Sequence, residues 1–111
     1  MEALERRIEY YRTAGGRFPY WEWHHSLKDT KTQAIVDVRL VRVRAGNFGS
    51  CEPIGEGVLE LKIDFGPGYR IYFGQVGRHA VLLLTGGDKS TQHANIQKAK
   101  EFWRDYKVRC L

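Results

Sequence analysis

Hydrophobic and polar residues alternate along the second half of the chain in the manner of β-strands. The alternation runs over 58–65 and again over 69–73, and 79–85 is apolar on both faces, which is typical of a central strand. Glycine-containing turns separate the three segments, so they predict an antiparallel three-strand meander. The Gly-Gly pair at 86–87 is expected to end the last strand, and the Gly, Pro and Ser residues of 47–57 predict a preceding loop.

The start of the chain carries a weaker alternation. Hydrophobic side chains at Leu4, Ile8 and Tyr10 predict a strand within 4–13, although Arg6 interrupts the pattern and leaves a helix as the alternative. A glycine pair follows, and Pro19 then suits the first turn of a short helix. The first half of the chain therefore begins with a strand and a short aromatic helix, which carries Tyr20, Trp21 and Trp23.

Two further helices are predicted from caps and helical spacing. Asp29 is a good N-cap for a segment that runs to the Gly-Asn pair at 46–47. Within it 36–40 alternates like a strand, but the length of the segment favours a helix. Ser90 or Thr91 can cap the final helix, whose inward residues are expected to be Ile96, Ala99, Phe102 and Trp103.

These elements together predict a single α+β domain spanning residues 1–111. Its order is strand, helix, helix, three-strand meander and C-terminal helix, with all helices packed on one face of the sheet. The opposite face is expected to be open and charged. It would carry Glu60, Lys62, Asp64, Arg70 and Tyr72.

Composition limits the class of protein and suggests a partner. The 111 residues are 42% hydrophobic, which suits one globular domain. The longest apolar run, 80–84, is too short to cross a membrane, and the charges within 1–7 argue against a secretory signal, so we expect a cytoplasmic protein. Eighteen Lys and Arg residues against thirteen Asp and Glu give a net charge of +5, which favours an anionic partner such as nucleic acid.

Short motifs exclude several chemistries. The two cysteines are far apart, so we expect free thiols, and neither they nor the four histidines have metal-ligand spacing. The glycines of 66–70 lack the third glycine of a dinucleotide loop, and Asp88 stands where a Walker motif has glycine. Lys89, between a strand end and a helix start, is either an anion-binding residue or a solvated turn lysine.

Two blocks of the sequence resemble a toxin family. The segment VLELKIDFGPGYRIYF of 58–73 and the segment LLLTGGDKSTQ of 82–92, followed by NIQKA of 95–99, resemble the meander and C-terminal block of the "addiction module killer protein" group. That group belongs to the RelE/ParE superfamily and is close to HigB. The resemblance implies a RelE-like fold and the toxin of a type II toxin–antitoxin pair. It also implies an endoribonuclease, an mRNA interferase that cuts mRNA on the ribosome without a metal or another cofactor.

The resemblance also implies roles for particular residues. Arg70 matches an arginine that contacts the scissile phosphate, Lys89 matches a basic residue after the last strand, and Lys62 matches a lysine of the preceding strand. The resemblance implies that the ribose 2′-hydroxyl attacks the adjacent phosphate. From their facing positions alone, we expect Lys62 or Tyr72 as the base and Lys89 as the partner of the phosphate or the leaving group. Further RNA contacts are assigned to Arg39, Arg42, Asp88 and Gln92.

Departures from the family pattern leave alternatives open. Glu60 and Asp64 stand where RelE has lysines, and Asn95 lies near the place of a late RelE tyrosine. A ParE-like inhibitor of DNA gyrase shares the fold, and a basic open sheet also fits a non-catalytic RNA-binding module. For the toxin, the expected partners are mRNA, the ribosome and a cognate antitoxin of the helix-turn-helix type, with no membrane.

Overall fold

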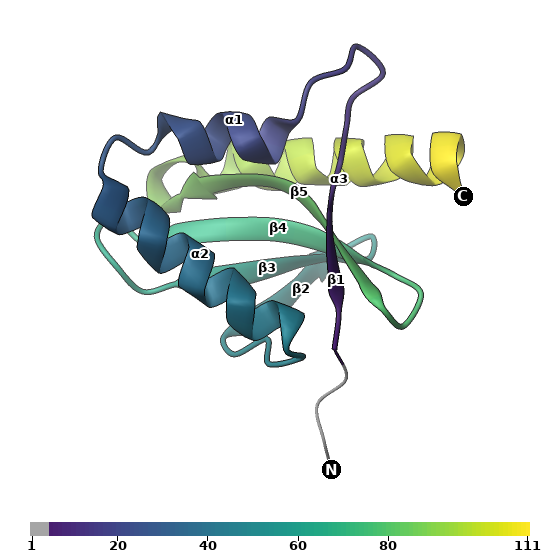
Figure 1. Ribbon diagram of the computed structural model, residues 1–111. Coiled ribbons are helices and arrows are strands. Elements are labelled where there is room, and N and C mark those ends of the chain that lie inside the picture. Colours follow the sequence, from purple (N-terminus) through teal and green to yellow (C-terminus); the bar gives the residue numbers. More distant parts are fainter. Residues whose placement is uncertain (1–4) are drawn as a thin grey trace.

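A five-stranded mixed sheet forms the centre of the computed structural model, which describes residues 5–111 (Figure 1). The strand order is β1-β5-β4-β3-β2; β1 runs parallel to β5, and the other neighbours are antiparallel. The strands are β1 Arg7–Tyr10, β2 Cys51–Gly55, β3 Val58–Ile63, β4 Tyr69–Val76 and β5 Ala80–Asp88. The strand predicted at the start of the chain is confirmed for its described part, while Leu4 lies outside the described residues.

Within residues 5–111, three α-helices flank the sheet, and the first two start at the predicted signals. Pro19 occupies the first turn of α1, and the Asp29 carboxylate accepts a hydrogen bond from the Lys31 backbone N–H at the start of α2. At the start of α3, Thr91, one of the two predicted caps, occupies the N-cap position but makes no capping hydrogen bond with its side chain, and Asp88 caps the short 3₁₀ turn that leads into the helix. The helices are α1 Pro19–Ser26, α2 Thr30–Arg44 and α3 Gln92–Cys110, and the 3₁₀ turn is Lys89–Thr91.

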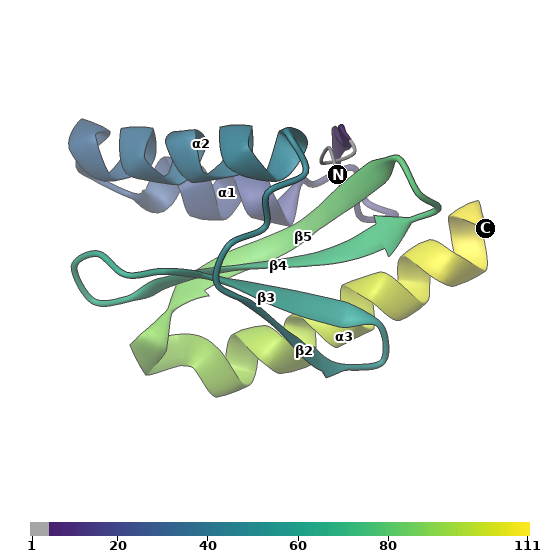
Figure 2. The same cartoon turned by 90° about the horizontal axis from the view of Figure 1, so that it is seen from below.

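The helices cover both faces of the sheet, so the predicted one-sided arrangement is wrong. Figure 2 shows α1 and α2 on one face and α3 on the other. Two separate buried clusters result. The first joins α1 and α2 to the sheet through residues such as Tyr20, Val36 and Phe73. The second joins α3 to the opposite face, where Trp103 packs near Gly74 and Tyr72 is fully buried.

The sheet is also wider and longer than the predicted meander. β2 lies within the segment expected to be a loop. It is an edge strand with a register shift directly after Pro53, and both features tolerate a proline. β5 continues through the Gly-Gly pair expected to end it. Trp23 of α1 packs over Gly86 and Asn95 of α3 over Gly87, so a side chain at either position would collide with a helix residue.

The helices can also be compared with the dimensions of a bilayer. Among residues 5–111, no helix combines the length and the apolar composition needed to cross a membrane.

Candidate functional site

A cleft of about 360 Å³ opens where β3 ends and β4 begins. Strand register explains its composition, because Lys62 lies directly opposite Arg70 on the neighbouring strand, and Arg70 lies opposite Gly87, two residues before Lys89. We call it the basic cleft. Its lining residues are Ser50, Lys62, Ile63, Asp64, Gly68, Arg70 and Lys89. The structure thus brings together three of the four predicted catalytic residues.

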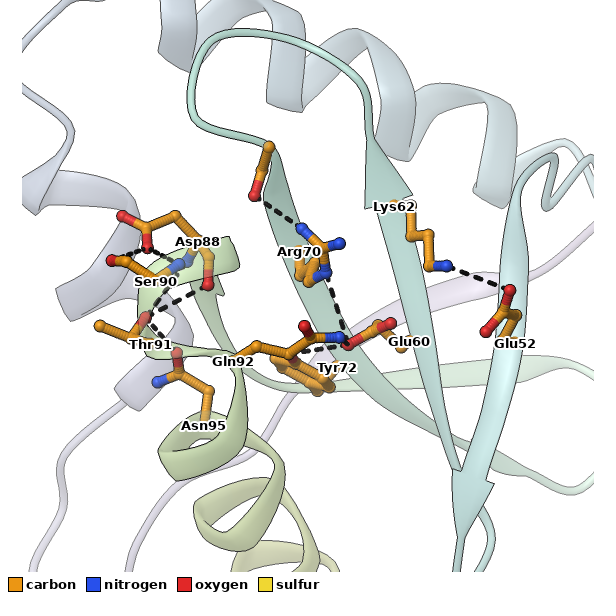
Figure 3. A network of polar contacts seen from close by, with 11 residues as sticks. Glu52, Glu60, Lys62, Arg70, Tyr72, Asp88, Ser90, Thr91, Gln92 and Asn95 are labelled. Atoms are coloured by element: carbon orange, nitrogen blue, oxygen red, sulfur yellow. Dashed lines mark hydrogen bonds and ion pairs between the residues drawn. The ribbon is translucent and has the colours of Figure 1, made fainter.

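Arg70 is held in place from two sides. One of its terminal nitrogens donates a hydrogen bond to the Gly68 carbonyl oxygen at 2.9 Å. Its Nε lies 3.7 Å from Oε2 of Glu60, and the arginine side chain is 13% exposed. Figure 3 shows that its other terminal nitrogen points to the side on which Lys62 lies. The guanidinium therefore presents a fixed donor to the basic cleft, the arrangement that suits an anionic oxygen.

Behind Arg70 lies a buried carboxylate. Glu60 is 1% exposed, and its Oε2 accepts hydrogen bonds from the Tyr72 hydroxyl and from Nε2 of Gln92, each at 2.9 Å (Figure 3). Burial, together with the neighbouring Glu60 carboxylate, raises the pKa of Tyr72 above the ordinary value. The hydroxyl consequently keeps its proton and remains a donor to Glu60.

Lys62 and Lys89 are more loosely held than Arg70. The ammonium of Lys62 lies 3.0 Å from Oε1 of Glu52, a carboxylate that is 63% exposed. Exposed ion pairs contribute little free energy, so a phosphate can replace this partner at small cost. Lys89 is exposed at the start of the 3₁₀ turn. Asp64 adds one carboxylate to the same cleft.

The structure does not favour Tyr72 as a base. Its side chain is fully buried under α3 and does not line the basic cleft. A base must accept a proton from the substrate, whereas burial and the contact with Glu60 keep the Tyr72 hydroxyl protonated. Tyr72 instead holds Glu60, which in turn faces Arg70. Its position is therefore that of a support residue behind the cleft.

Two of the residues assigned to RNA have internal partners. The Gln92 amide donates to Glu60, and Oδ1 of Asp88 accepts hydrogen bonds from the Ser90 backbone N–H and from its hydroxyl. The hydrogen bonds from Ser90 lower the pKa of Asp88. Both residues therefore stabilise the turn and the network beside the basic cleft, and direct RNA contact by either of them stays a prediction.

Arg39 and Arg42 lie outside the basic cleft. They line a separate groove along α2, and Ile63 belongs to the lining of both the groove and the cleft. The guanidinium of Arg39 donates to the backbone carbonyl oxygens of Phe48 and Ser50 and so fastens the connection to β2. Burial, followed by the nearby charge of Arg42, lowers the pKa of Arg39. Their predicted RNA contacts would need RNA to extend beyond the cleft.

Sequence reasoning placed two acidic residues on the charged face but gave them no role at the site. Glu60 is the buried counter-charge of Arg70, and Asp64 lines the cleft itself. A signal for Glu60 existed in the register of the hairpin, because Glu60 lies directly opposite Tyr72 across β3 and β4. A carboxylate opposite a tyrosine hydroxyl on a covered face indicates a buried hydrogen bond.

Within residues 5–111, no group of three or more His, Cys, Asp or Glu side chains is arranged so that it could hold a metal ion.

Comparison with known proteins gives one relative. No protein-family model matches the chain. A Haemophilus influenzae protein described as an uncharacterized protein is 42% identical over 78 residues, which make up 70% of this chain and 79% of that protein. The similarity therefore extends over most of both chains. That description names no activity, so the geometry of the site has to supply the functional argument.

Proposed function

We propose that this chain, which belongs to the same family as the Haemophilus influenzae protein, is the toxin of a type II toxin–antitoxin pair. In this proposal the toxin cleaves mRNA on the ribosome. One observation carries this proposal: Lys62, Arg70 and Lys89, from three neighbouring elements, converge on one open cleft. Each of the three can direct an N–H donor at a phosphodiester oxygen and at the additional negative charge that develops during cleavage.

The reaction would proceed by transfer within the RNA strand. The ribose 2′-oxygen forms a bond to the adjacent phosphorus and gives up its proton, and the bond from phosphorus to the 5′-oxygen breaks. The products are a 2′,3′-cyclic phosphate and a 5′-hydroxyl, which takes up one proton. Arg70 stabilises the negative charge of the intermediate from its fixed position, and Lys89 approaches from the exposed turn.

Other groups of the basic cleft would accept and donate the protons of this reaction. Lys62 and Asp64 both line the cleft and are the two candidates for the acceptor of the 2′-hydroxyl proton. A carboxylate is the better acceptor at neutral pH, because a lysine ammonium already carries its proton. We assign the acceptor role to Asp64 and charge stabilisation to Lys62. Lys89 then serves as donor to the leaving 5′-oxygen.

Two further elements of the proposal come from the resemblance to the RelE/ParE superfamily. The mixed five-stranded sheet with a C-terminal helix is compatible with a RelE-like fold. The cognate antitoxin would be a small helix-turn-helix protein, and its acidic side chains would complement the net charge of +5. We place the reaction in the cytoplasm, where the ribosomes are.

A cleavage assay in a translating extract tests the proposal. Wild-type protein should produce new mRNA 5′ ends at ribosome-occupied codons, mapped by primer extension. Arg70→Ala should lower the cleavage rate by about 10²-fold or more, the usual effect of removing one donor to a developing oxyanion. Arg70→Lys keeps a positive charge opposite Glu60, so it separates loss of the guanidinium geometry from loss of folding.

Arg78→Ala is the matched control, because Arg78 is an exposed arginine in the turn at the other end of β4. It removes the same charge and should cleave at the wild-type rate. Intact mRNA with the folded wild-type protein would refute the nuclease. A DNA gyrase supercoiling assay would then test the ParE-like alternative, and retained RNA binding without cleavage would favour a non-catalytic module.

A further inference from the structure

A second cleft, of about 410 Å³, lies where β4 begins and β5 ends, at the same end of the sheet as the basic cleft. We call it the aromatic cleft, because Trp23 and Tyr69 form one of its walls, with ring centroids 6.3 Å apart. Thr91 and Asn95, from the 3₁₀ turn and the start of α3, contribute a polar wall. The function proposed above leaves this cleft without a role.

The side-chain amide of Asn95 is held in one orientation. The Thr91 hydroxyl donates to Oδ1 of Asn95 at 2.5 Å, and the same oxygen lies against Gly87, where the absence of a side chain makes room for it. Because Oδ1 is engaged, the nitrogen of the amide is the end left to face outward. Figure 3 shows this nitrogen pointing away from Thr91. Asn95 therefore presents a fixed N–H donor beside an aromatic wall.

The two clefts lie at the same end of the sheet, with Tyr69 on the face that carries α1 and Arg70 on the face that carries α3. Tyr69 lines the aromatic cleft and the next residue, Arg70, lines the basic cleft; in the same way Asp88 lines the first and Lys89 the second. Tyr69 and Asp88 are themselves directly paired across β4 and β5. A chain of nucleotides that passes over this end of the sheet can place a phosphate in one cleft and a base in the other.

We propose that the aromatic cleft binds a nucleobase of the RNA strand whose phosphate occupies the basic cleft. The rings of Trp23 and Tyr69 stand edge to face, with 61° between their planes, so the base stacks on one of them and contacts the edge of the other. A ring nitrogen or carbonyl oxygen on the edge of the base accepts a hydrogen bond from Nδ2 of Asn95. Aromatic stacking accepts any base, whereas a fixed donor selects among base edges. This inference rests on the proposed function for the phosphate, but the base contact itself is measurable without cleavage.

The direct test is an NMR titration of the ¹⁵N-labelled full chain with the four ribonucleoside 5′-monophosphates and, separately, with inorganic phosphate. The monophosphates should shift the Trp23 indole N–H and the Asn95 side-chain amide, and inorganic phosphate should shift neither. Asn95→Ala should weaken the binding of the preferred nucleotide by about threefold to tenfold, the value of one hydrogen bond. Gln97→Ala, an exposed amide on the same helix, is the matched control and should bind like wild type.

Cleavage mapping separates the two proposals. If Asn95→Ala still cuts mRNA but with a relaxed base preference next to the cut, both proposals are supported. If wild type and Asn95→Ala cut with the same preference, and nucleotides shift the same resonances as inorganic phosphate, the base site is refuted while the nuclease stands. If nucleotides shift Trp23 and Asn95 but wild-type protein cuts no mRNA, the base site stands and the nuclease is refuted.

Discussion

The buried network around Glu60 makes the sharpest energetic prediction. Oε2 of Glu60 receives hydrogen bonds from Tyr72 and Gln92 and faces Nε of Arg70 at 3.7 Å. Glu60→Gln keeps the shape and one acceptor oxygen but removes the charge. Hydrogen bonds to a charged group contribute about 1 kcal/mol more than neutral ones, so weakening two of them costs about 2 kcal/mol.

The ion pair itself should add little to this loss. At 3.7 Å the attraction between the two charges is about 4–5 kcal/mol with an effective dielectric constant of about 20. Burying the carboxylate costs several kcal/mol in lost hydration, which Glu60→Gln recovers, so the two contributions nearly cancel. We expect Glu60→Gln to lower the free energy of unfolding by about 2 kcal/mol and Tm by about 8 °C. Glu60→Ala leaves both donors and Arg70 unpaired and should cost about 3–5 kcal/mol.

Urea unfolding followed by tryptophan fluorescence measures these values. Glu52→Gln is the control, because it removes an exposed carboxylate that pairs with Lys62 on the neighbouring strand, and it should change the free energy by less than about 1 kcal/mol. In a double-mutant cycle, Glu60→Gln and Tyr72→Phe should be non-additive by about 1 kcal/mol. A Glu60→Gln variant as stable as wild type, with purely additive effects, would show that the carboxylate does not organise this network.

Three further predictions concern pH and single side chains. Burial raises the pKa of Tyr20 and Tyr72, so above about pH 10 the unfolded chain loses protons that the folded chain retains. The contribution of each tyrosine to the free energy of unfolding should be constant below that pH and fall above it by about 1.4 kcal/mol per pH unit. Urea unfolding of Tyr20→Phe between pH 9 and 11.5 should therefore show a shallower fall than wild type. Asp88→Ala removes the acceptor that caps the 3₁₀ turn and should lower stability by about 1 kcal/mol, measured by thermal unfolding, with Asp88→Asn largely unchanged. Gly87→Ala places a methyl group 2.0 Å from Oδ1 of Asn95, so it should cost about 1–3 kcal/mol in urea unfolding and displace the Asn95 amide resonance; an unshifted resonance would contradict this packing.

Local signals in the sequence were sufficient for most elements. Alternation predicted β3 and β4, and Pro19 and Asp29 marked the starts of α1 and α2, because these features depend on neighbouring residues alone. β2 was missed because Pro53 and nearby glycines favour a loop locally, while pairing with β3 provides the hydrogen bonds that make the segment a strand. β5 was predicted too short because the closeness of two helices to its glycines is a tertiary contact.

The candidate site, like the fold, could be predicted from the sequence only in part. Lys62 and Arg70 were placed together because strand register is set by the turn between β3 and β4. The burial of Glu60 and Tyr72 was not predictable from alternation, which identifies polar positions but does not say whether another element covers them. The side of the sheet on which α3 packs decides that question. The apolar stripe of α3, with Ala99 and Trp103, fits either face of a sheet equally well.

The position of α3 therefore determines what the charged face can do. By covering Tyr72 and Glu60, the helix buries part of the predicted open face and leaves the basic cleft where β3 ends and β4 begins. Arg70 lies at the boundary, with its Nε against the buried carboxylate and its terminal nitrogens near the cleft. A lone surface arginine would have to lose its side-chain freedom on binding a phosphate, whereas Arg70 has already lost it on folding. The same packing brings Asn95 against Gly87, so one helix orients the residues proposed to bind the phosphate and the base.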